Sequence, residues 1–288
     1  MEWKGKNAYI SGGSSGIGFA VAQELLSRGC SVVLIARDAD RLANSRGRLL
    51  RFAGMSADSP PSGSVGPVRT LPLDVSDHEA VIEALGKGFD TYGEPDIVVN
   101  CAGMAYPDYF EKIPYDVFRK TMDTNLGGAW NLLSALVPRM IERNTGVIAS
   151  ISSIAGFLGV FGYAAYSASK FALFGLMEVL RSELKPHGIR VHVLCPPDTD
   201  TPQLAQEDAT KPPETRAVSG NGGLMQPFEV AEALIRGIER GRFVIIPGFF
   251  GNFTYLMSRL FPGLVRLIMD GDIKKARNRV PVQVKKET

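Results

Sequence analysis

The chain has 288 residues, of which 45% are hydrophobic and 22% charged, and its formal net charge is +2. This size and polarity suit one large α/β domain, and the mild basicity, with no basic stretch interleaved with aromatic residues, predicts no nucleic-acid partner. The first six residues contain no hydrophobic stretch, so we expect neither a signal peptide nor an amino-terminal anchor. The three cysteines lack paired spacing, so we expect neither disulfides nor a metal site.

The first predicted strand, residues 7–11, runs into a glycine-rich turn and then a helix. A lone glycine turn is weak evidence, because turns use glycine for its backbone freedom. Here Gly12, Gly16 and Gly18 stand where a side chain would keep the backbone from a phosphate, and the following helix N-terminus favours an anion. The segment therefore predicts a dinucleotide site, to which we also assign Ser14, Ser15 and Ile17.

The second predicted strand, residues 31–36, is followed by Arg37. An acidic residue at this place would bind the ribose hydroxyl of NAD, whereas arginine suits the additional phosphate of NADP. The residue favours NADPH as the cofactor. The alternative is that Arg37 is only a solvated cation at the end of a strand.

Further apolar runs at residues 68–73, 97–100, 146–151, 189–194 and 243–246 bring the number of candidate strands to seven. They alternate with segments of helical period, notably residues 115–143 and 164–185, which predicts a parallel sheet with crossover helices. The Ser/Pro/Gly-rich stretch 54–67 is interpreted as a surface insertion without function. Residues 203–226 are polar and are interpreted as a substrate lid that orders on cofactor binding.

Tyr166 and Lys170 are four residues apart in the second long helix, which places both side chains on one face. An ammonium group near a phenol favours the phenolate and lowers a pKa that is otherwise near ~10. Hydride transfer to a ketone builds negative charge on oxygen, so such a site needs a proton donor and a hydrogen-bond donor at that oxygen. The pair alone occurs by chance in long helices, and its meaning depends on the upstream motifs.

Together these residues resemble the short-chain dehydrogenase/reductase family over roughly residues 5–246. The motifs that carry the resemblance are Ser11-Gly-Gly-Ser-Ser-Gly-Ile-Gly18, Leu73-Asp74-Val75, Asn100-Cys-Ala-Gly103, Asn125 and Ser153, the last thirteen residues before Tyr166. The resemblance implies a single-domain, doubly wound Rossmann fold of about seven parallel strands. It also implies cofactor contacts at Asp74, Val75, Asn100, Ala102, Gly103, Tyr166 and Lys170.

The resemblance further implies a catalytic set of Asn125, Ser153, Tyr166 and Lys170. Tyr166 would be the acid, Ser153 would bond the carbonyl, and Lys170 would lower the tyrosine pKa and hold the nicotinamide ribose. Asn125 would order a water that resupplies protons. Structural alternatives stay open, since Ser153 suits a turn and Asn125 is able to bond its own backbone.

The segment Cys195-Pro-Pro-Asp-Thr-Asp-Thr-Pro202 departs from the family, because Pro197 replaces a glycine and stiffens the turn. Pro196, Thr199 and Thr201 are assigned to the cofactor site. The segment resembles the 3-ketodihydrosphingosine reductases, a branch that reduces the 3-oxo group of a long-chain base in sphingolipid synthesis. This implies a long-chain lipid ketone as substrate. The alternatives are a reductase of another apolar carbonyl (3-oxoacyl, steroid or retinoid) and a non-catalytic NADPH-binding scaffold.

Residues 249–288 form an apolar and basic extension beyond a catalytic domain of residues 1–248. At about 100° per residue, apolar side chains between Phe253 and Ile268 share one face, and Pro262 should interrupt the helix. The run is too broken to span a bilayer, which takes about 20 apolar residues. It predicts peripheral contact with the cytosolic face of a membrane, the endoplasmic reticulum in a eukaryote. The alternative is a cytoplasmic enzyme whose extension caps the pocket or a subunit interface.

The two long helices carry more apolar positions than one core face requires. In the resembling family the corresponding pair forms a dimer interface. A homodimer is therefore expected, with a tetramer as the alternative.

Overall fold

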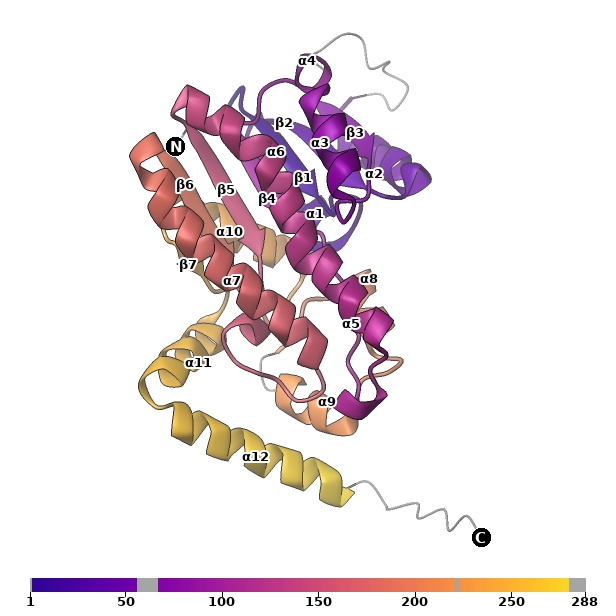
Figure 1. Cartoon of the computed structure of the whole chain (residues 1–288), viewed down its shortest axis with the longest axis vertical. Coiled ribbons are helices and arrows are strands. Elements are labelled where there is room, and N and C mark those ends of the chain that lie inside the picture. The colour runs from indigo at the N-terminus through magenta and orange to yellow at the C-terminus, as the bar shows by residue number, and fades with distance from the viewer. Residues whose placement is uncertain (1, 56–66, 221–222, 280–288) are drawn as a thin grey trace.

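The computed structural model describes residues 2–55, 67–220 and 223–279. Its seven strands form one parallel sheet in the order β3-β2-β1-β4-β5-β6-β7 (Figure 1). The strands are β1 (Asn7–Ser11), β2 (Ser31–Ala36), β3 (Val68–Pro72), β4 (Ile97–Asn100), β5 (Gly146–Ile151), β6 (Ile189–Leu194) and β7 (Val244–Ile245). The predicted strands and their parallel arrangement are confirmed.

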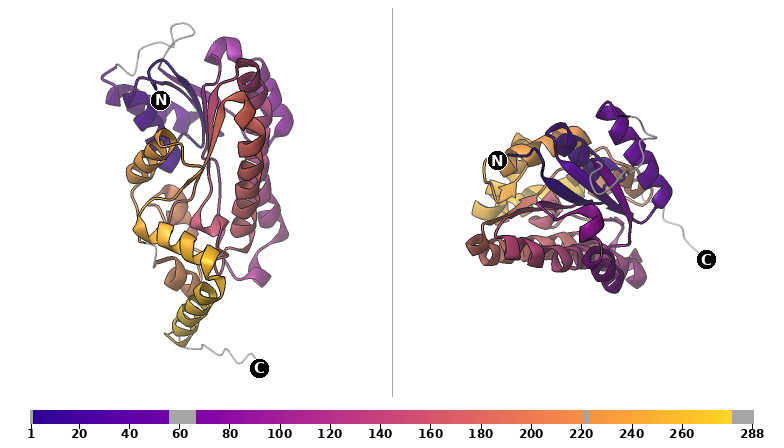
Figure 2. Two further views of the ribbon diagram at one scale, coloured as in Figure 1. Left: turned by 90° about the vertical axis from the view of Figure 1, so that its left-hand side faces the viewer. Right: turned by 90° about the horizontal axis from the view of Figure 1, so that it is seen from above.

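Helices cover both faces of the sheet (Figure 2). Helices α1 (Gly16–Ser27), α2 (Ala39–Phe52) and α10 (Pro227–Glu239) pack on one face, and α3 (His78–Gly86), α6 (Gly128–Arg143) and α7 (Ala164–Leu184) pack on the other. Successive strand residues serve opposite cores, since Ala8 and Ile10 join the first layer and Tyr9 joins the second. The doubly wound fold is therefore confirmed.

The strand order changes direction between β1 and β4. From β1 the chain adds β2 and β3 toward one edge of the sheet, and from β4 it adds β5, β6 and β7 toward the other edge. In sheets of this kind a crevice opens at the carboxyl ends of the strands around that point, and ligands bind there. The glycine turn follows β1, and the Asn100–Gly103 turn follows β4. Both motifs that the sequence assigned to a cofactor thus meet at the same edge.

The first long helix contains a bend. Helix α5 (Tyr115–Met122) passes through a π-helical turn, η3 (Asp123–Gly127), into α6, and Asn125 lies within that turn. A π turn carries an extra residue and reorients the chain at this point. The remaining short elements are α4 (Phe89–Tyr92), η2 (Phe110–Lys112), η4 (Ile154–Gly156) and η5 (Lys185–His187).

The predicted lid contains two short helices, α8 (Pro202–Glu207) and α9 (Pro213–Ser219). The extension forms α11 (Phe249–Leu260) and α12 (Pro262–Arg279), so the break predicted at Pro262 is confirmed. Helix α12 lies against α9 (Figure 1). The Arg277 guanidinium donates to Glu214 at 3.1 Å. Within the described ranges no helix is long and apolar enough to cross a membrane. Most of the predicted insertion, residues 56–66, lies outside the described residues.

Candidate active site

The glycines of the first turn are required by the space around them. Gly12 has φ +66°, and a Cβ there would lie 2.9 Å from the backbone of Cys101 and Ala102. A Cβ on Gly18 would collide with the Gly12 carbonyl oxygen, and one on Gly16, with φ +53°, would lie 3.0 Å from the Thr201 methyl group. The turn therefore packs directly on the chain after β4 and after β6.

Ser11 and Asn100 connect the glycine turn to the turn after β4 by hydrogen bonds. The Ser11 hydroxyl donates to Asn100 Oδ1 at 2.7 Å and accepts from the Ala102 amide at 3.2 Å. Asn100 is buried and does not line the cavity described next. Its side chain fixes the two turns relative to each other, which differs from the direct cofactor contact expected from the sequence.

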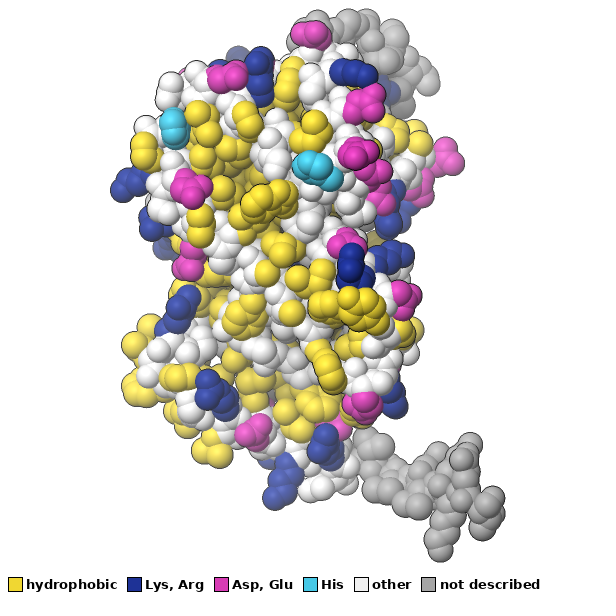
Figure 3. Space-filling model, in the orientation of Figure 1, with side chains coloured by type: hydrophobic (Ala, Val, Ile, Leu, Met, Phe, Trp, Pro, Cys, Tyr) yellow, Lys and Arg dark blue, Asp and Glu magenta, His cyan; other side chains and the backbone are white. Residues whose placement is uncertain are grey.

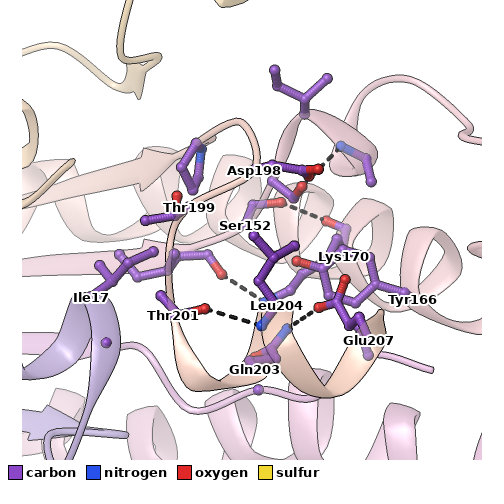
Figure 4. A pocket seen from close by; sticks show the side chains of 18 of the residues that line it. Ile17, Ser152, Tyr166, Lys170, Asp198, Thr199, Thr201, Gln203, Leu204 and Glu207 are labelled. Atoms are coloured by element: carbon purple, nitrogen blue, oxygen red, sulfur yellow. Dashed lines mark hydrogen bonds between the residues drawn. The ribbon is translucent and has the colours of Figure 1, made fainter. Parts of the chain in front are cut away.

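A cavity of about 770 Å³ is lined by residues of the turns, the predicted lid and the C-terminal helices. Figure 4 shows the part of it that lies between Ile17, Tyr166 and Glu207. All the other residues that the sequence assigned to the cofactor line it, namely Gly12, Ser14, Ser15, Gly16, Ile17, Gly18, Arg37, Asp74, Val75, Ala102, Gly103, Tyr166, Lys170, Pro196, Thr199 and Thr201. The glycine cradle and this lining fit a dinucleotide.

At the β2 end of the cavity, Arg37 is 65% exposed and lies 3.9 Å from the Asp74 carboxylate. Burial tends to raise the pKa of Asp74, but two hydrogen bonds from Ser76 and the charge of Arg37 outweigh it and hold that pKa below its usual value. Arg41 lines the same end, beside Asp38. Two guanidinium groups are thus available there to an anion.

Thr199 and Thr201, in the segment after β6, both form hydrogen bonds to neighbouring backbone groups through their hydroxyls. Thr201 accepts from the Leu204 amide at 3.2 Å and caps α8, while Thr199 donates to the Pro197 carbonyl at 3.0 Å. Both still line the cavity. The cap starts α8 at the point where the chain leaves the cofactor end, and this sets the direction of the lid.

Ser153, Tyr166 and Lys170 line the same cavity. Ser153 lies two residues after the end of β5, and its hydroxyl accepts from the Ala155 amide at 3.1 Å. Tyr166 and Lys170 belong to α7. The Lys170 ammonium lies 5.6 Å from the centre of the Tyr166 ring and donates to the Ile151 carbonyl at 2.8 Å. Burial lowers the pKa of Lys170 to about 8.

The pKa of Tyr166 differs from the expectation. Burial and then the charge of Glu207 raise it, and a hydrogen bond with Ser153 works in the opposite direction. The predicted lowering by Lys170 is not found, since the buried ammonium is itself pushed toward its neutral form and is bonded to Ile151. The protonated phenol is the favoured form.

Asn125 lies behind this group rather than in the cavity. Its Nδ2 donates to the Met104 carbonyl and to the Ser169 hydroxyl, both at 2.9 Å, and its Oδ1 accepts from the Met104 amide at 2.8 Å. The side chain therefore ties the turn after β4 to α7. These bonds explain why the asparagine is placed at the π turn.

Sequence reasoning missed a buried carboxylate beside the tyrosines. Glu207, on α8, is 7% exposed, lines the cavity and accepts from the Tyr163 hydroxyl at 2.6 Å. Burial raises the pKa of Glu207. No sequence motif predicts the role of Glu207, because its contact with Tyr163 depends on how the segment that contains α8 folds over α7.

The C-terminal helices supply an apolar wall. Phe250, Phe253 and Met257 of α11 line the cavity together with Leu264 and Ile268 of α12. The Phe157 ring meets Tyr255 edge-on at 5.0 Å, which seats α11 on the chain after β5. The single apolar face expected from the sequence is thus divided by the break at Pro262, and part of it faces the cavity.

A doubly wound sheet whose glycine turn shares one cavity with a serine, a tyrosine and a lysine defines an oxidoreductase that uses a dinucleotide. The comparison with protein families agrees, because the model described as "short chain dehydrogenase" matches residues 6–212. The chain belongs to the short-chain dehydrogenase family. Membership in this family implies a nicotinamide cofactor and a reaction at a carbonyl or alcohol carbon.

Curated relatives narrow the comparison. A 3-dehydrosphinganine reductase of Danio rerio is 37% identical over 92% of this chain and 76% of that protein. A 3-ketodihydrosphingosine reductase of Dictyostelium discoideum is 38% identical over 92% of this chain and 80% of that protein. A solved short-chain dehydrogenase from Streptomyces avermitilis superposes with a TM-score of 0.74 at 26% identity, covering 96% of this chain and 99% of that one.

Proposed function

We propose that the protein reduces 3-ketodihydrosphingosine to dihydrosphingosine with NADPH, a step in sphingolipid synthesis. The similarity to reductases of this substrate over more than nine tenths of the chain supports the proposal. The observation that carries it is the cavity itself, which runs from the glycine turn past Tyr166 to the apolar side chains of α11 and α12. This layout suits a polar head that reacts beside a nucleotide and a hydrocarbon chain that continues along the wall.

The reaction would be divided among few groups. When bound, the nicotinamide supplies a hydride to the carbonyl carbon. Tyr166 would donate its proton to the carbonyl oxygen, and its raised pKa keeps the phenol in the protonated form that a donor needs. Ser153 would hydrogen-bond the same oxygen and fix its direction.

Lys170 and Asn125 would support this centre. Lys170 would hold the nicotinamide ribose, and its lowered pKa would allow it to exchange a proton near neutrality. Asn125 would keep the turn after β4 against α7, and the water that we predict beside it would return protons from solvent.

The preference for NADPH over NADH is proposed on the two arginines at the β2 end. Arg37 and Arg41 both line the cavity, and Asp38, the nearest acidic residue in sequence, accepts from the Arg41 amide at 2.9 Å. Guanidinium groups bind phosphate through paired hydrogen bonds. An additional phosphate on the adenosine ribose would meet them there.

Contact with a membrane is proposed for the extension, residues 249–288, outside the catalytic unit of residues 1–248. Apolar side chains of α11 and α12 that do not line the cavity are exposed, among them Leu256 (53%), Leu260 (60%) and Leu267 (68%). Such side chains beside lysines suit the interface of an anionic bilayer. We propose the cytosolic face of a membrane, the endoplasmic reticulum in a eukaryotic cell, where the substrate would enter between the two helices.

Liposome flotation tests this placement. Changing Leu256, Leu260 and Leu267 together to serine leaves the cavity wall intact and should release the protein from anionic vesicles. Flotation equal to that of the unchanged protein would contradict membrane contact through these helices.

A homodimer is proposed through α6 and α7. Figure 3 shows hydrophobic side chains gathered on the face that these helices present, where Trp130 is 58%, Phe171 44% and Val179 51% exposed. Exposed apolar groups of this kind are typical of subunit interfaces. Light scattering that shows a stable monomer at micromolar concentration would contradict the proposal.

The experiment for the function follows NADPH oxidation with a panel of ketones. 3-Ketodihydrosphingosine should have the largest kcat/KM, ahead of a 3-oxoacyl thioester, a steroid ketone and retinal. A larger value for any of the other three would move the assignment to that substrate class.

A further inference from the structure

The proposed substrate carries an amino group on the carbon beside its ketone, and the inference that follows rests on the proposed function. An aliphatic amine of this kind is largely protonated near neutral pH. Its charge would lie two covalent bonds from the carbon that accepts the hydride. A pocket built for this substrate therefore has to meet a cation next to Tyr166.

Glu207 is the carboxylate at that place. Its Oε2 accepts from the Tyr163 hydroxyl at 2.6 Å and its Oε1 accepts from Gln203 Nε2 at 2.9 Å, so both oxygens are fixed in position. The Tyr163 and Tyr166 rings have centroids 5.4 Å apart. Figure 4 shows Glu207 beside Tyr166 at the cavity. Each carboxylate oxygen has two acceptor directions, and these two hydrogen bonds occupy one on each.

The charges around Glu207 leave a negative excess on the cavity side. The carboxylates of Asp198, Glu207 and Asp208 share one buried ammonium, that of Lys211, at 3.7, 4.0 and 3.9 Å. Asp208 also pairs with Arg216 at 2.8 Å. These three carboxylates thus meet two cations, and two of the three, Asp198 and Glu207, line the cavity.

Lys170 is another cation near Tyr166, with its ammonium 5.6 Å from the ring centre. That ammonium donates to the Ile151 carbonyl at 2.8 Å at the end of β5. Burial favours its neutral form and outweighs the charge of Glu207, which acts in the opposite direction, so the pKa of Lys170 falls to about 8. Lys170 is therefore a weaker counter-charge for Glu207 than an ordinary lysine, and a substrate ammonium would meet the two carboxylates that line the cavity here, Glu207 and Asp198.

We infer that Glu207 selects the substrate by binding the ammonium group adjacent to its ketone. In this role the residue is a specificity determinant, and the paired contact also aligns the carbonyl oxygen with Tyr166 and Ser153. A charge-assisted hydrogen bond in a buried site is stronger than a neutral one. Ketones that lack the amine would leave the carboxylate without its partner and would be reduced poorly.

The test compares two substrates in two enzymes. The substrates are 3-ketodihydrosphingosine and the same molecule with hydrogen in place of the amino group, and the enzymes are wild type and Glu207→Gln. Glutamine keeps the shape of the side chain and removes its charge, and its amide replaces one of the two acceptor oxygens by an NH2 donor. We expect Glu207→Gln to lower kcat/KM for the amino ketone by about 10-fold to 100-fold, and to leave the amine-free ketone unchanged or improved.

Asp208→Asn is the matched control, because this carboxylate also contacts Lys211 but does not line the cavity. It should lower both values equally or neither. Turnover of the amine-free ketone reports whether Glu207→Gln is folded. Wild type that reduces both ketones equally, or a variant that loses both in proportion, would overturn the role of Glu207 and leave the proposed function standing. Wild type that does not reduce the amino ketone would overturn both.

Discussion

Replacing Gly12 by alanine tests the central packing of the site without any assay of turnover. Gly12 has φ +66°, and the new Cβ would lie 2.9 Å from three backbone atoms of Cys101 and Ala102. The left-handed conformation costs an L-residue about 1–2 kcal/mol. Overpacking against backbone, which is unable to move as a side chain can, adds about 1–3 kcal/mol.

Gly241 provides the control, since it has φ +65° and nothing within 4 Å of the added Cβ. Gly241→Ala should lower the free energy of unfolding by only about 1–2 kcal/mol, the conformational part. Gly12→Ala should lower it by about 2–5 kcal/mol, the sum of both parts, and should also disturb the Ser11 hydrogen bonds to Asn100 and Ala102. Urea denaturation followed by circular dichroism measures both changes.

Equal losses in the two alanine variants would refute the steric argument. NADPH titration by fluorescence gives an independent test. The Cβ of Gly12→Ala would displace the glycine turn from the position where it meets the phosphate, so this variant should bind NADPH more weakly. Gly241→Ala, just after the C-terminal end of α10, should leave the NADPH affinity unchanged.

Three further predictions concern the reacting groups. Tyr166→Phe should lower kcat by about 100-fold to 10,000-fold with nearly unchanged NADPH binding, and retained turnover in a stopped-flow assay would remove the proton-donor role. Arg37→Ser should weaken NADPH by about tenfold, the low end for an arginine that is 65% exposed, while NADH affinity stays the same; equal loss for both cofactors by calorimetry would contradict a phosphate contact. Because the pKa of Lys170 falls from 10.5 to about 8 on folding, the unfolded chain binds more protons between these values, and wild type should gain stability relative to Lys170→Met as the pH rises from 8 to 10.5. Urea midpoints that move in parallel for the two proteins would show that the buried ammonium is not titrating there.

Local patterns were sufficient for the strands because each one is a short apolar run bounded by turn residues. Burial on both faces of a parallel sheet produces such runs, as Val32, Val33, Leu34 and Ile35 in β2 illustrate. The motif residues that line the cavity were also readable, since they follow strand ends that meet at one edge. Asn100 and Asn125 do not line the cavity, because their side chains are held by hydrogen bonds within the protein, Asn100 with Ser11 and Asn125 with Met104 and Ser169.

Electrostatics at the centre was not readable from spacing. The spacing of four positions from Tyr166 to Lys170 predicts proximity on a helix, and the ammonium is indeed 5.6 Å from the ring centre. The pKa of Tyr166 is nevertheless raised, because burial and the charge of Glu207 determine its direction. Glu207 lies 41 positions further along the chain. Distances of this kind in sequence carry no periodic signal.

The amino-acid sequence by itself determined the parallel sheet, the glycine cradle and the family, because these depend on local patterns of apolar residues, glycines and strand-end motifs. Only the tertiary structure decided that α11 and α12 wall the cavity and that Glu207 stands beside Tyr166. Both outcomes depend on how the chain after β6 and after β7 folds back over the carboxyl edge of the sheet. Packing between segments distant in the chain sets that path, and no single segment encodes it.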